Sequence, residues 1–69
     1  MRITFDKEAD AMYIEVSDKN FATNRNIDDE TILDLDESGK IVGIELLNVS
    51  KRMTEDFLSD IRVQNLVST

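Results

Sequence analysis

The chain has 69 residues, with fifteen acidic and eight basic side chains and neither cysteine nor histidine. This length allows one small domain over residues 1–69. The core of such a domain supplies only about 3–5 kcal/mol of net stability unless a disulfide, a metal or self-association adds to it. A disulfide, a thiolate metal site, the usual zinc ligand and the usual general base near neutral pH are all excluded. Self-association is the source of additional stability that remains, so we expect a homodimer.

No stretch is long and apolar enough to span a membrane, and the first residues lack the apolar core of a signal peptide. We therefore expect a cytoplasmic protein without a membrane partner. The net charge is −7: residues 1–49 carry twelve acids against five bases, whereas residues 50–69 balance three against three. Such a surface repels a phosphate backbone, which argues against nucleic-acid binding, and attracts a basic protein partner. The alternative is that the acids only maintain solubility.

Alternation of apolar and polar residues predicts strands along most of the chain, separated by polar turn signals. After Asn48 the period changes: Thr54 suits an N-cap, and apolar residues then follow at helical spacing. The predicted fold class is α+β, an antiparallel β-meander of four or five strands over about residues 2–47, followed by one C-terminal helix over about residues 55–66. The predicted strands cover residues 2–5, 11–16, 23–27, 31–36 and 41–47.

Residues 34–45 match the calcium loop of an EF-hand, with oxygen side chains at places one, three and five, glycine at six and glutamate at twelve. In this interpretation the metal ligands are the side chains of Asp34, Asp36, Ser38 and Glu45 and the carbonyl of Lys40. An EF-hand also needs a helix on each side, and residues 25–33 are β-branched without a helical apolar stripe. The flanking sequence therefore argues against a calcium site. The favoured interpretation is that the protein holds no metal ion and no other cofactor.

The same residues also predict a β-hairpin. Strands over Thr31–Asp36 and Ile41–Leu47 would be joined by a type I turn and a glycine with positive φ at Gly39. Asp36 would cap this turn by accepting backbone N–H groups. We favour the hairpin over the calcium loop.

Two details of the hairpin stay open. Gly43 interrupts the second strand and marks either a bulge or a close backbone approach. A register slip of one residue would exchange Ile32 and Asp34 with Leu33 and Leu35, because side chains alternate between the faces.

Three strings in order resemble a known family of short bacterial and archaeal proteins, the domain of unknown function 2283. They are Ile3–Ile14, then Asp34–Lys40 with its Leu-Asp-Glu-Ser-Gly core, and Ile41–Leu47 with a segment ending at Arg52. The resemblance covers about residues 2–52 and implies a compact β-meander followed by a helix. Members are often encoded beside small predicted toxins, which implies an antitoxin-like or accessory role. The family has no established catalytic residues to carry over.

The residues themselves argue against an enzyme, since no histidine can activate a serine and a domain this small has little volume for a cleft. We expect Asp34 and Asp36 to be exposed strand and turn acids, Phe5 and Phe57 to be core, and Phe21 to be a partly exposed anchor. The leading hypothesis is a small acidic interaction module that binds a basic protein partner. The alternatives are a calcium-responsive module using residues 34–45 and a purely structural homodimer.

Overall fold

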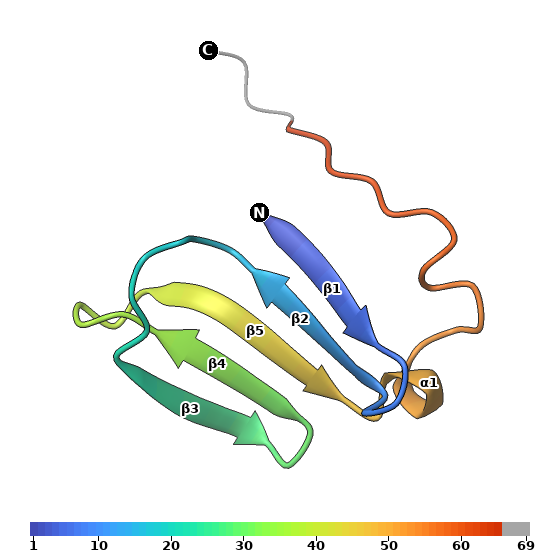
Figure 1. The fold of residues 1–69 in the computed structure, drawn as a ribbon, viewed down its shortest axis with the longest axis horizontal. Coiled ribbons are helices and arrows are strands. Elements are labelled where there is room, and N and C mark those ends of the chain that lie inside the picture. Colours follow the sequence, from blue (N-terminus) through green and yellow to red (C-terminus); the bar gives the residue numbers. More distant parts are fainter. Residues whose placement is uncertain (66–69) are drawn as a thin grey trace.

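The computed structural model of the chain describes residues 1–65, which form five strands and one short helix (Figure 1). All five segments predicted as strands are strands, to within one residue at either end. The elements are β1 (Arg2–Asp6), β2 (Ala11–Glu15), β3 (Thr23–Asp28), β4 (Thr31–Leu35), β5 (Ile41–Leu47) and α1 (Val49–Arg52).

The strands form one antiparallel sheet in the order β1-β2-β5-β4-β3. The predicted meander therefore describes β3, β4 and β5, whereas β2 and β3 are not neighbours. Residues 16–22 connect these two strands across the end of the sheet (Figure 1). Backbone hydrogen bonds hold this connection there, from the Val16 N–H to the Val42 carbonyl at 2.9 Å and from the Ala22 N–H to the Leu35 carbonyl at 2.8 Å. The last strand in the sequence thus becomes the central strand of the sheet.

The turn between β4 and β5 has the predicted geometry. The Asp36 N–H donates to the Lys40 carbonyl at 2.9 Å, and the Gly39 N–H donates to the Asp36 carbonyl at 3.0 Å. Gly39 has φ +83°, a left-handed conformation that glycine adopts without steric cost. The Asp36 carboxylate accepts the N–H groups of Ser38 and Lys40 at 2.9 and 3.0 Å, so its predicted capping role is confirmed.

The register, which the sequence left open, pairs Leu33 with Ile44 and Asp34 with Gly43. A shift in pairing between Asp34 and Leu35 places a bulge in β5 directly before Gly43. Because side chains alternate along each strand, this register places Leu33 and Asp34 on opposite faces of the sheet.

We call these two surfaces the apolar face and the polar face. Cross-strand pairs such as Phe5 with Met12 and Ile14 with Ile44 define the apolar face, and the pair of Tyr13 with Glu45 defines the polar face. The apolar face carries Ile3, Phe5, Met12, Ile14, Leu33, Ile44 and Leu46, and the polar face carries Tyr13, Glu15, Ile32, Asp34 and Glu45.

The C-terminal helix lies earlier than predicted and is shorter. It spans Val49–Arg52, residues 54–59 form hydrogen-bonded turns, and residues 60–65 have no regular secondary structure; Leu66, the predicted last helical residue, lies outside the described residues. A helix of the predicted length, over about residues 55–66, is stable only if its apolar stripe packs against other elements. Phe57 packs on the sheet, edge to face with Phe5 at 5.7 Å between ring centroids, but Leu58 and Ile61 remain 42% and 51% exposed. The helical spacing was therefore a misleading signal for the described part of this segment.

A residue from the β1–β2 turn supplies the cap of α1. The N-cap residue, Asn48, makes no side-chain capping bond. Instead the Asp10 carbonyl accepts the Val49 N–H at 3.1 Å, and the Asp10 carboxylate accepts the Ser50 N–H at 3.1 Å and the Ser50 hydroxyl at 2.6 Å. Val49 is completely buried at this junction. These contacts tie α1 to the end of the sheet.

Candidate functional site

The structure divides the residues of the calcium-loop interpretation between two places. Asp34 and Glu45 lie on the polar face, whereas Asp36 and Ser38 lie in the turn, where the Ser38 hydroxyl donates to the Asp36 carboxylate at 2.8 Å. The Lys40 carbonyl closes the hairpin. Within residues 1–65, no group of three or more acidic side chains is placed to hold a metal ion. The hairpin interpretation is confirmed, and the proposed calcium ligands are not gathered into one site.

The prediction that Asp34 is an exposed strand acid is wrong, because Asp34 is buried. Only 8% of its surface is accessible, and its carboxylate accepts a hydrogen bond from the Tyr13 hydroxyl at 3.0 Å. Tyr13 stands opposite Glu45 in the β2–β5 pair and reaches diagonally across the central strand to Asp34. Burial, the hydrogen bond and the Asp34 charge all raise the pKa of Tyr13, so this hydroxyl remains a donor.

The ring of Tyr13 explains the glycine at position 43. A Cβ atom at this position would overlap the Tyr13 hydroxyl and ring. The predicted close approach at Gly43 is thus confirmed, beside the bulge that was the other interpretation. The sequence signal was a lone glycine in a β-branched strand, although nothing in the sequence identified Tyr13 as the side chain that needs the space.

Glu45 completes a polar cluster of three residues, Tyr13, Asp34 and Glu45. The pKa of Glu45 is raised above its ordinary value of 4.5, first by burial, then by the negative charge of Asp34 and by a hydrogen bond to it. A carboxyl group in this setting retains its proton at a pH where an exposed glutamate has lost it. The two acids can then share that proton while Tyr13 donates to Asp34. The Tyr13 hydroxyl and the Glu45 carboxyl thus both hydrogen-bond to Asp34, and the three side chains form one network on the polar face.

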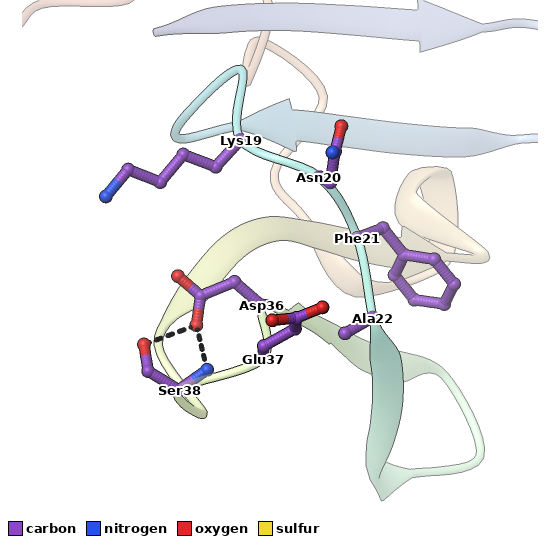
Figure 2. A pocket seen from close by; sticks show the side chains of 7 residues that line it. All are labelled: Lys19, Asn20, Phe21, Ala22, Asp36, Glu37 and Ser38. Atoms are coloured by element: carbon purple, nitrogen blue, oxygen red, sulfur yellow. Dashed lines mark hydrogen bonds between the residues drawn. The ribbon is translucent and has the colours of Figure 1, made fainter.

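A hollow of about 610 Å³ lies at the end of the sheet opposite α1, between the β2–β3 connection and the β4–β5 turn (Figure 2). It is open to solvent, and Phe21 beside it is 55% exposed, as predicted. Asp36 and Glu37 contribute carboxylates, and Lys19, whose positive charge helps to lower the pKa of Asp36, also lines the hollow (Figure 2). This hollow combines an exposed aromatic ring with negative charge.

Comparison with known proteins identifies the family. The chain belongs to the family described as protein of unknown function DUF2283, whose model matches residues 2–50. The matched range includes all five strands and the first residues of α1, so the predicted resemblance is confirmed. No curated protein and no solved structure matches the chain. Among the described residues, no helix is long and apolar enough to cross a membrane.

Proposed function

We propose that this protein is a small, non-enzymatic, acidic interaction module that binds a basic protein partner in an antitoxin-like or accessory role. The observation that carries the proposal is the amount of negative charge left unpaired on the folded surface. All charged side chains belong to the described residues, and the ion pairs are Arg2 with Glu15, Arg52 with Glu30 and Arg62 with Asp60. These use three of fifteen carboxylates and three of eight basic groups, which leaves twelve carboxylates, of which Asp34 is buried, against five basic groups.

The hollow of Figure 2 supports a particular place for this contact. The Asp36 carboxylate already accepts hydrogen bonds within the turn. Glu37, in contrast, is exposed and makes no hydrogen bond or ion pair within the described residues. A lysine or arginine of the partner could pair with Glu37 and lie over the ring of Phe21. A cation over an aromatic ring contributes about 0.5–1 kcal/mol at an exposed site, in addition to the charge pair.

The experiment is capture of partners on the tagged full-length protein from its own cells at low and high salt, with mass spectrometry and light scattering. We expect a stoichiometric basic partner at low salt that is released at high salt, because screening weakens contacts between exposed charges. Capture of no partner, or of one whose retention does not depend on salt, would count against the proposal.

Matched charge reversals locate the contact. Glu37→Lys should weaken binding of the captured partner about tenfold or more, since it places like charge against the partner. Glu8→Lys makes the same change in net charge in the β1–β2 turn, at the opposite end of the sheet, and should weaken binding far less. Equal losses for both variants would mean that the partner responds only to total charge and does not use the hollow.

A further inference from the structure

Within residues 1–65, no second layer covers the apolar face of the sheet, apart from the ring of Phe57 on Phe5. In the described part of the chain the buried hydrophobic residues are only Met12, Val42 and Val49. Leu33 and Ile44, at the middle of the apolar face, remain partly exposed. Figure 1 shows α1 at one end of the sheet, with the following segment leaving past the β1 edge. A sheet with one apolar face normally buries it against another element, so this fold is incomplete as a single layer.

The accessible surface supports the same conclusion. The chain exposes 5749 Å², whereas a folded monomer of 7.9 kDa is expected to expose about 4,400 Å². This excess of about 1,300 Å² includes the extended segment after α1 as well as the uncovered face. A stable protein–protein interface of standard size buries about 800 Å² on each partner. The excess is therefore of the same order as the area that one such interface buries.

The distribution of charge favours a second copy of the chain over a basic partner as the occupant. The three central strands, β2, β5 and β4, place no charged side chain on the apolar face, whereas they place Glu15, Asp34 and Glu45 on the polar face. The edge strand β3 adds one basic residue to the apolar face, Arg25, which pairs with Leu33. A basic partner would find no countercharge at the centre of the apolar face. Two copies that each carry a net charge of −7 could meet there without bringing acidic side chains of their central strands together.

We propose that two copies of this chain pack apolar face to apolar face as a symmetric dimer. Two such sheets lie about 10 Å apart with their inner side chains interdigitated, which buries Leu33 and Ile44 of both copies. The polar faces then point outward on both sides of the dimer. The dimer does not depend on the proposed binding of a basic partner, because it uses a different surface.

The first test is the mass of the full-length protein by light scattering and sedimentation over a wide concentration range. We expect twice the chain mass of 7.9 kDa and a melting temperature that rises with protein concentration. The dimer should persist at high salt, since its interface is apolar, whereas the basic partner should be released. A monomer at all concentrations would overturn the proposed dimer. It would not bear on the proposed binding of a basic partner at the hollow. This first measurement requires no variant and is unaffected by any folding defect.

A pair of adjacent substitutions then tests which face is used. Leu33→Lys places a charge in the apolar face and should raise the dissociation constant of the dimer more than tenfold. Ile32→Lys makes the same change one residue earlier, on the polar face beside Glu45, and should leave the dimer intact. Circular dichroism would confirm that both variants are folded. A dimer that survives Leu33→Lys, or that both variants disrupt equally, would place the interface elsewhere and overturn the proposal.

Discussion

The two faces of the sheet are built from the same strands but reach stability in different ways. On the polar face, Tyr13, Asp34 and Glu45 satisfy one another, and the Tyr13 ring covers the backbone at Gly43. On the apolar face, aliphatic side chains such as Leu33 stay partly exposed, and the described part of the chain forms no second layer over them. The polar face is therefore complete within one chain, whereas the apolar face is the surface on which we propose that a second copy packs. Substitutions on the polar face should change the stability of the chain itself, independently of its association.

Gly43→Ala should produce the largest effect on the polar face. The added methyl group overlaps the Tyr13 hydroxyl and ring, so the ring must move and lose its bond to Asp34. We expect a loss of about 2–3 kcal/mol in the free energy of unfolding, the range for overpacking combined with a broken buried hydrogen bond. Denaturant titration measures it.

Gly39→Ala is the matched control for this substitution. Its new Cβ meets no atom within 4 Å, so only the positive φ opposes it, at about 1 kcal/mol. Combining Gly43→Ala with Tyr13→Ser removes the ring and should reduce the cost of the added methyl group. An equal cost of Gly43→Ala with and without the ring would show that the close approach is not responsible.

Arg52→Ala tests the end of the sheet, which belongs to neither face. The Arg52 guanidinium donates to the carbonyls of Glu30 and Leu47 and to the Thr31 hydroxyl, and so ties α1 to β4 and β5. Hydrogen bonds from a charged group contribute about 1.5–3 kcal/mol, so we expect a loss of about 2 kcal/mol in thermal or denaturant unfolding.

Arg62→Ala removes the same kind of side chain from an exposed ion pair with Asp60. Such a surface pair contributes little, and we expect no measurable change. Similar losses for the two arginine variants would mean that overall charge, and not the anchoring of α1, determines the effect of Arg52.

Tyr13→Phe keeps the ring over Gly43 and removes only the hydroxyl. Asp34 then remains buried without its donor, which should cost about 1–2 kcal/mol in the free energy of unfolding. Chemical denaturation at neutral pH measures this difference. An unchanged stability would indicate that water or Glu45 replaces the hydroxyl, so that Tyr13 contributes mainly through its ring.

Among the substitutions in the polar cluster, Glu45→Gln should give the smallest effect, and one that depends on pH. The folded state raises the pKa of Glu45 above 4.5, so between these two values the folded form binds more protons than the unfolded form. The stability contributed by this group is present at lower pH and is lost as the pH rises through that window. Glu45→Gln should therefore raise the melting temperature relative to the wild type at neutral pH, and the difference should vanish in acid.

Asp36→Asn provides a contrast of opposite sign. Hydrogen bonds from Ser38 and from the Lys40 backbone lower the pKa of Asp36, so its contribution is present above 3.8 and is lost as the pH falls. The variant should lose stability at neutral pH and show a weaker decline in acid. Melting temperatures between pH 3 and 8 would distinguish the two profiles. A loss of stability at neutral pH in the Glu45→Gln variant would mean that the negative charge of Glu45 is not unfavourable in the folded state. That result would contradict the assignment made for Glu45.

The strands and the β4–β5 turn could be predicted because their signals are local. Alternation along Ile3 and Phe5 requires only that one face be buried, and the turn depends on Asp36 and Gly39, which act within a few residues of each other. The candidate site was less accessible to sequence reasoning. Phe21 was expected as a partly exposed anchor, but its position beside the acidic turn follows from the path of the β2–β3 connection.

The sequence by itself thus determined the family, the five strands, the turn at Gly39 and the acidic character of the surface. Only the tertiary structure decided that β5 is central, that Asp34 is buried beneath Tyr13, and that Asp10 and Arg52 anchor a short helix at Val49–Arg52. The physical reason is that these features join residues far apart in the chain. Register, burial and packing depend on which segments meet, whereas alternation and turn chemistry act between near neighbours.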